Sequence, residues 1–175
     1  MELDFDVVDL PEPEHPTEGD LAPDFERPLV NDEYWEDTSL AELTEEGPVV
    51  LIFHPMDGAF PATYIWNEIR DRGLADHDLS VVGLSISTPY EHKTLLEERD
   101  IEDTDIRLFS DPANEVAEAY GIVNDLDGMT GISEPRPATF VIDDDRTVQY
   151  AWAADQHPDF PDYDDLEAAV EAVVE

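Results

Sequence analysis

The sequence contains no cysteine. A scaffold held by disulfides is therefore excluded, and so is a metal site built on thiolates. The same absence removes the side chain whose thiolate acts as the nucleophile in many redox enzymes. Any activity of this chain has to come from other groups.

Basic residues are scarce: 8 Lys and Arg stand against 46 Asp and Glu, which gives a formal net charge of −38. Without a basic patch, nucleic acids and anionic membranes are poor partners. Disorder is one explanation for such a balance. The acidic residues alternate with regular apolar runs, however, and this favours a folded chain.

The second explanation is adaptation to concentrated salt. At molar ionic strength the Debye length falls to about 3 Å, so repulsion between surface carboxylates is nearly abolished. In dilute buffer the same charges destabilise the compact state. The composition resembles that of cytoplasmic proteins from extremely halophilic, haloarchaeal-type microbes, and we therefore expect a cytoplasmic location.

Long hydrophobic runs are also missing, since no stretch approaches the roughly 20 apolar residues that span a bilayer. The first residues, Met1-Glu2-Leu3-Asp4, are acidic and unlike a secretory signal. We expect a single domain over residues 18–175, preceded by an acidic, proline-containing arm over residues 1–17 with at most one short strand.

The centre of the chain predicts a strand–helix–strand unit. Residues 49–53 form a continuous apolar run, typical of a strand buried on both faces. Apolar residues then recur at helical spacing from Ala62 to Ile69, and residues 79–86 form a second buried strand. This order indicates parallel strands joined by a right-handed crossover.

Two further helices have start signals in the sequence. Thr88 is placed as the N-cap of one, with Pro89 as its first residue and Glu91 as the other half of a capping box. Asp111 is expected to cap the next helix, with Pro112 at its first position. A short strand over residues 107–109 separates the two.

The C-terminal part changes to an antiparallel pattern. Residues 139–142 and 147–152 flank an acidic turn over residues 143–146, which predicts a hairpin. A final helix is expected to bury four apolar residues at helical spacing: Leu166, Ala169, Val170 and Val173. No internal repeat is evident.

The junction after the first buried strand is a candidate site, because it leads into the start of a helix. Residues 53–63 leave this strand and enter a helix, and the free amides of a first helical turn can stabilise a thiolate there. Ala62 stands at the candidate position. A methyl group cannot act as a nucleophile.

Several segments, in order, carry a family resemblance over roughly residues 18 to 153. They are Gly19-Asp20-Leu21-Ala22-Pro23-Asp24-Phe25, Phe53-His54-Pro55-Met56-Asp57, Ser87-Thr88-Pro89-Tyr90-Glu91-His92-Lys93, Ser110-Asp111 with Ala117-Glu118-Ala119-Tyr120-Gly121, and Thr139-Phe140-Val141-Ile142-Asp143. Together they resemble the peroxiredoxin family of the AhpC/TSA or redoxin type. The resemblance implies an α/β, thioredoxin-like fold with a central mixed β-sheet flanked by helices.

The resemblance also implies a degenerate site. Family members act through the motif P-x-x-x-T-x-x-C, and here Pro55 matches the proline, Ala59 stands at the threonine position and Ala62 at the cysteine position. Arg136 is similar to the family's arginine but lies one residue earlier, and Pro137 resembles the cis-proline of thioredoxin relatives. No catalytic residue and no cofactor are therefore expected.

Three functions stay open at this stage. The leading hypothesis is a cysteine-less homologue without thiol-peroxidase activity, acting as a binding or assembly module with an unknown protein partner or as a homodimer. The alternative is an antioxidant oxidoreductase that reduces peroxides, if Ala62 replaces a natural cysteine or if another group substitutes for it. Thr63, with His54 as its base, is one such group, although a packing role is the simpler explanation of His54.

The third hypothesis is a small-anion site in the degenerate pocket, formed by Arg136, Thr63 and Pro137 against the amides of the helix. An arginine held by surface carboxylates is the simpler reading of Arg136. No metal site is expected: the five histidines show no paired ligand spacing, and a hairpin turn accounts for Asp143-Asp144-Asp145.

Overall fold

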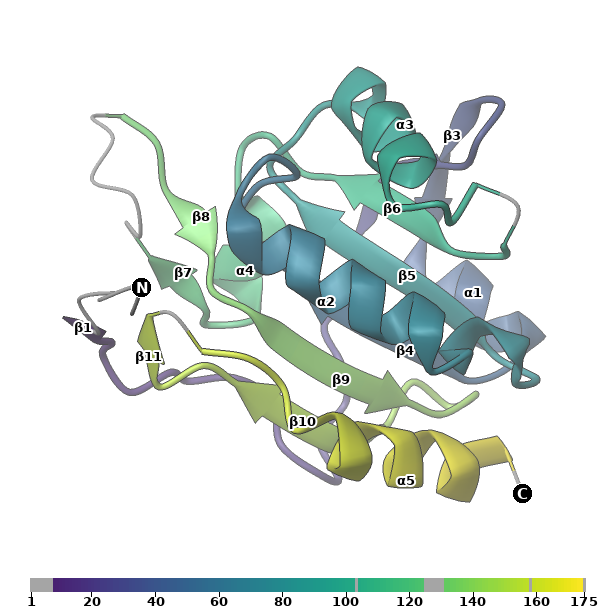
Figure 1. Ribbon diagram of the computed structural model, residues 1–175. Helices are drawn as coiled ribbons and strands as arrows, with labels where there is room; N and C mark the ends of the chain where they lie inside the picture. The colour runs from purple at the N-terminus through teal and green to yellow at the C-terminus, as the bar shows by residue number, and fades with distance from the viewer. Residues whose placement is uncertain (1–7, 103, 125–130, 158, 175) are drawn as a thin grey trace.

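The computed structural model describes residues 8–102, 104–124, 131–157 and 159–174. Its centre is a seven-stranded mixed sheet with the strand order β10-β9-β4-β5-β6-β2-β3 (Figure 1). The strands are β2 (Glu26–Val30), β3 (Trp35–Ser39), β4 (Val49–Phe53), β5 (Ser80–Ser85), β6 (Arg107–Ser110), β9 (Ala138–Ile142) and β10 (Val148–Ala153). β4, β5 and β6 are parallel, and the remaining pairings are antiparallel.

Two small antiparallel pairs lie outside this sheet. β1 (Val8–Asp9) pairs with β11 (Gln156–His157), and β7 (Val123–Asn124) pairs with β8 (Glu134–Pro135). β1 is a short strand within the N-terminal arm. Residues 1–7 of that arm lie outside the described residues.

Helices cover both faces of the sheet (Figure 1). They are α1 (Leu40–Glu46), α2 (Phe60–Asp71), α3 (Pro89–Glu98), α4 (Glu115–Ala119) and α5 (Tyr163–Val174), with a 3-10 turn η1 (Leu74–Asp76) after α2. Apolar residues of α1 and α4 join one core cluster, and those of α2, α3 and α5 join the other.

The strand–helix–strand prediction is confirmed as β4–α2–β5 with parallel pairing. All five residues of β4 are buried, because alternate side chains enter the two core clusters. Gly83 lies in the middle of β5. A Cβ at this position would lie 2.3 Å from Trp66 Cζ2 and 2.6 Å from Leu108 Cδ2, so glycine allows α2 to pack closely on the sheet.

The start of α3 is confirmed, including its capping box, in which Thr88 N donates to Glu91 Oε1 at 3.2 Å. The expected start of the next helix is wrong. α4 begins at Glu115, and its N-cap, Asn114, has a left-handed backbone with φ 59°. Residues 111–114 form a turn instead, and Asp111 Oδ2 reaches across it to accept a hydrogen bond from Val116 N at 2.8 Å.

The C-terminal hairpin and helix are confirmed as β9, β10 and α5, but of the four residues expected to be buried in α5 only Leu166 and Val170 are, whereas Ala169 and Val173 are partly buried. Arg146 closes the hairpin turn with φ 63°, a conformation that favours glycine. Its side chain offsets part of that strain, because Nε donates to the Ala22 carbonyl at 3.0 Å. Among the described residues, no helix has the length and apolar character needed to cross a membrane.

Candidate functional site

The junction between β4 and α2 contains the residues that the sequence singled out. Pro55 and Ala62 are buried, Ala59 and Thr63 are partly exposed, and the N-cap Ala59 offers no side-chain hydrogen bond to the helix. Ala62 is 0% exposed and packs within the core cluster between α2 and the sheet. Its methyl group is therefore a core contact.

Arg136 and Pro137 lie in the link between β8 and β9 and bond to Ala154, the residue that follows β10. Arg136 is buried, and its Nη1 donates to the carbonyl of Ala154 at 2.8 Å. Burial lowers the pKa of the Arg136 guanidinium, and the nearby Asp155 carboxylate acts in the opposite direction. The Pro137 carbonyl accepts from Ala154 N at 2.9 Å. At least one N–H of Arg136 thus has a structural acceptor.

A buried polar pair that the sequence did not predict lies beside the junction. Asp57 Oδ2 and His92 Nδ1 are 2.6 Å apart, and His92 Nε2 lies 2.9 Å from the Phe109 carbonyl oxygen. The carbonyl can only accept, so Nε2 carries a proton. The Asp57 carboxylate and the His92 ring thus form a buried pair, which is an ion pair when both ring nitrogens are protonated.

Asp57 is held ionised by this partner. Burial alone would raise the pKa of its carboxyl, but the hydrogen bond and charge of His92 outweigh burial and keep that pKa below its ordinary value. Two serines complete what we call the Asp57 network (Asp57, Ser85, Ser87 and His92). Ser85 Oγ donates to Asp57 Oδ1 at 3.0 Å, and Asp57 N donates to Ser87 Oγ at 3.0 Å.

This network fastens the loop before α2 to the end of β5 and to α3. Ser85 is the last residue of β5, and its Oγ also accepts from Ser87 N at 3.1 Å. Three elements that are distant in the sequence are thereby fixed at one end of the sheet. This arrangement positions the junction. Among the four side chains of the network, the only hydroxyl nucleophiles are those of Ser85 and Ser87, and both already take part in hydrogen bonds.

His54 lies next to this network but is not bonded into it. Its ring is fully buried and packs edge-on against Trp66, with ring centroids 5.8 Å apart. Neither ring nitrogen has a hydrogen-bond partner among the described residues, and Nδ1 is 3.9 Å from Asp57 Oδ1. Burial lowers the pKa of His54 to about 4, although the Asp57 charge acts to raise it. A histidine with this pKa is a weak general base at neutral pH.

We predict a pH dependence of stability that can be traced to His54. Its pKa is about 4 in the folded protein against an ordinary value of 6.5, so the unfolded chain binds more protons between these values. Stability should therefore fall as the pH falls through this window, by about 2–3 kcal/mol for this group between pH 7 and pH 4.5.

Urea unfolding of the protein and of His54→Phe at pH 7 and pH 4.5 measures the contribution of His54 to the pH dependence of stability. The phenylalanine keeps the ring packing on Trp66. The two proteins should therefore differ only in how much the free energy of unfolding changes between the two pH values, and this difference reports the contribution of His54. His77→Gln changes a partly exposed histidine and serves as the control. The same slope in His54→Phe as in the parent would contradict the assignment.

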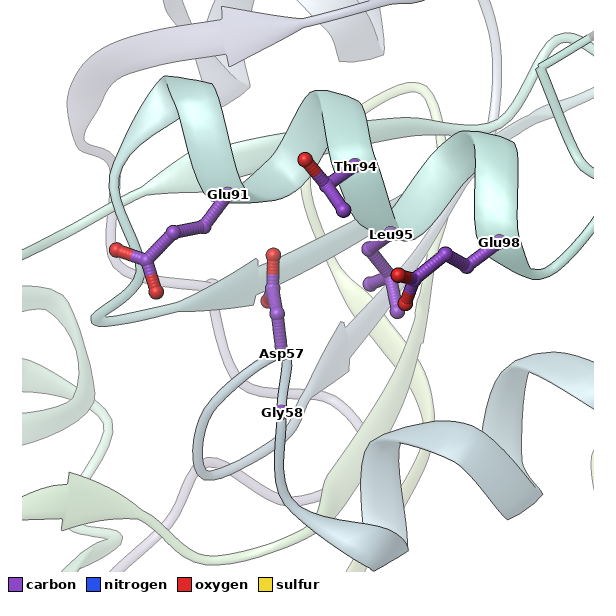
Figure 2. Close-up of a pocket in the computed structure, with 6 residues that line it drawn as sticks. All are labelled: Asp57, Gly58, Glu91, Thr94, Leu95 and Glu98. Atoms are coloured by element: carbon purple, nitrogen blue, oxygen red, sulfur yellow. The ribbon is translucent and has the colours of Figure 1, made fainter.

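A pocket opens between the junction loop and α3 (Figure 2). Its volume is about 220 Å³, and it is lined by Asp57, Gly58, Glu91, Thr94, Leu95 and Glu98. Figure 2 shows the Asp57 carboxylate pointing toward α3, with Glu91 and Glu98 along the same helix. We call this cavity the acidic pocket: Glu91 and Glu98 are exposed at it, and the Asp57 carboxylate is already bonded to His92 and Ser85.

Another group of carboxylates occupies the β9–β10 turn. Ligand atoms of Asp143, Asp144 and Asp145 lie within 4.8 Å of one another. Asp143 Oδ1 accepts from Asp145 N and Thr147 N, which is the bonding of a tight turn. The geometry agrees with the turn expected from the sequence.

Comparisons with known proteins agree with this architecture. The chain is 30% identical over 139 residues to the putative peroxiredoxin ycf42 of Pyropia yezoensis, covering 76% of this chain and 66% of that protein, slightly less than two thirds of its length. Among solved structures, it is similar to peroxidoxin BcpB from Mycobacterium tuberculosis, with 29% identity, a TM-score of 0.74, and coverage of 92% of this chain and 100% of that one.

The reduced 2-Cys peroxiredoxin of Plasmodium vivax has the same fold, with a TM-score of 0.74, 20% identity, and coverage of 90% of this chain and 81% of that one. The thioredoxin-like α/β fold expected from the sequence is thus confirmed. The AhpC/TSA family model matches residues 19–151. The chain belongs to the AhpC/TSA family.

Proposed function

We propose that this protein is a non-catalytic member of its family that acts as a binding or assembly module in a salt-rich cytoplasm. The observation that carries the proposal is the absence of cysteine from the whole sequence, combined with a fully buried alanine at the start of α2. In this proposal Ala62 occupies the place of the peroxidatic cysteine and Ala59 that of the threonine. The intact fold without its nucleophile favours recognition over turnover.

The two other functions have less support. For peroxide reduction, Thr63 would need a base, and burial leaves His54 a weak one. For anion binding, the Arg136 guanidinium already donates to the Ala154 carbonyl. The partner in the leading proposal is a second copy of the chain or another protein.

A peroxide-consumption assay in molar salt tests the proposal. With a thiol reductant present, we expect hydrogen peroxide to disappear no faster with the protein than without it, because the chain has no thiolate that can donate an electron pair to the peroxide and be regenerated by the reductant. Purified Ala62→Cys is the matched variant, since it restores a sulfur at the same helix end. Turnover by the unaltered protein above the protein-free rate would refute a non-catalytic role.

A further inference from the structure

Three aromatic side chains form a partly exposed cluster over the start of α2. Phe60 and Tyr64 belong to α2, and Phe160 comes from the segment that precedes α5. Their ring centroids are 6.3, 6.4 and 6.0 Å apart for the Phe60–Tyr64, Phe60–Phe160 and Tyr64–Phe160 pairs. We call these three residues the aromatic patch.

The patch leaves aromatic ring surface exposed to solvent instead of burying it in the core. Tyr64 is 60% exposed and Phe60 is 37% exposed, whereas Phe160 packs partly onto the core cluster beneath. Contiguous exposed apolar surface with a polar rim marks interaction sites, and aromatic residues supply much of the binding energy at such sites. Phe60 and Tyr64 are four residues apart and share one exposed face of α2, whereas Ala62, between them in sequence, faces the core.

The charges around the patch indicate what kind of partner fits it. The segment before α5 that carries Phe160 also carries Asp159 and Asp162. On the other side, two residues separate Phe60 from Asp57, which lines the acidic pocket. A second copy docked patch to patch would place the same carboxylates against these, whereas a basic segment would place opposite charges there, and salt screens such direct contacts least.

The protein already contains one contact of the kind that such a partner would make. Arg72 Cζ lies 5.5 Å from the ring centroid of Tyr163, and the same guanidinium bonds to three carboxylates: Glu68, Asp164 and Glu167. This is a guanidinium held at once by an aromatic face and by acidic groups. The aromatic patch and its acidic neighbours offer the same two elements to a group from outside the chain.

We propose that the aromatic patch docks an arginine-bearing basic segment of a partner protein. One guanidinium lies against the rings of Tyr64 and its neighbours, and further basic side chains of the same segment face the acidic pocket. This inference rests on the proposed binding function and names the chemistry of the partner.

Fluorescence anisotropy with the full-length protein and a labelled peptide, acetyl-Gly-Arg-Gly-Arg-Gly-amide, tests the docking. The peptide with citrulline in place of both arginines is the uncharged, nearly isosteric control. Measurements use the lowest salt at which circular dichroism shows the protein folded, because screening weakens attraction between charges. We expect the arginine peptide to bind about tenfold more tightly than the citrulline peptide.

Matched variants locate the contact. Tyr64→Ser should weaken binding of the arginine peptide about fivefold, whereas Tyr34→Ser, at a tyrosine with 54% exposure in the β2–β3 turn, should leave it unchanged. Glu98→Gln, in the acidic pocket, should weaken binding more than Glu97→Gln, an equal charge change on the neighbouring exposed residue of α3. Phe160→Leu is a second patch variant in case Tyr64→Ser is less stable.

Three outcomes would overturn the inference: equal affinity for the two peptides, equal loss in Tyr64→Ser and Tyr34→Ser, or tighter binding of a glutamate peptide. A fourth contradicting outcome would come from sedimentation velocity. If the protein is a dimer and Tyr64→Ser dissociates it, the patch is an interface with a second copy instead. If the arginine peptide binds tightly and no patch variant changes its affinity, the proposed binding function is kept and only this surface is refuted. Peroxide turnover by the unaltered protein would refute the binding function itself.

Discussion

Asp57→Ala is expected to lower the free energy of unfolding at pH 7 by about 3–5 kcal/mol, because it removes one partner from a buried ion pair. His92 is 0% exposed, and its Nδ1 faces the Asp57 carboxylate at 2.6 Å while Nε2 is occupied by the Phe109 carbonyl. Without Asp57, a buried N–H of His92 loses its acceptor and its countercharge. Ser85 Oγ loses its acceptor in the same step.

Urea unfolding in molar salt measures this loss. Asp57→Asn keeps an acceptor oxygen and the side-chain shape, so its loss should be smaller. Asp144→Ala changes an exposed carboxylate of the β9–β10 turn and should have little effect. Replacing both Asp57 and His92 by leucine should cost less than Asp57→Ala alone, since no unpaired charge is left. A loss below about 1 kcal/mol for Asp57→Ala would show that the pair contributes little.

Transfer from about 2 M to about 0.1 M salt is the second change for which we expect a large effect. The Debye length grows from about 2–3 Å to about 10 Å over this range, so carboxylates that were screened from one another begin to repel. With a net charge of −38 on one chain, the loss should be a large part of the roughly 5–15 kcal/mol that stabilises a typical domain.

Thermal unfolding followed by circular dichroism at both salt concentrations measures the effect. Potassium chloride and a more weakly salting-out potassium salt should give similar midpoints at equal ionic strength if screening is the cause. Sucrose at low salt should restore little, since it does not screen charge. Equal unfolding midpoints at low and high salt would contradict the proposed adaptation to salt.

The elements with local signals could be predicted from the sequence. β4 could be predicted because five consecutive apolar residues are rare outside a doubly covered strand, and α3 because Thr88 and Glu91 satisfy its first amides. β3 had no such signal. Its first three side chains are exposed and it reads as an acidic loop, so only its pairing with β2 makes it a strand.

The site could be predicted only in part, because its contacts depend on tertiary structure. Asp57 and His92 both stand in segments that resemble the family, yet they are 35 residues apart, and their contact depends on where α3 packs over the end of β5. The start of α4 was misplaced for a related reason. Asp111 and Pro112 are a common helix start, but the Asp111 carboxylate also forms an ion pair with Arg27 on β2, with Nε and Oδ1 3.0 Å apart.

The open edge of the sheet at β3 has a consequence for aggregation. An unpaired edge strand offers its backbone to any neighbouring chain, and sheets can grow between molecules in this way. Glu36 and Asp37 are exposed on β3, and side chains on adjoining strands lie only about 5 Å apart. A second molecule adding its own β3 there would confront like carboxylates at close range, so this edge discourages fibril-like stacking even where dissolved ions weaken repulsion over longer distances.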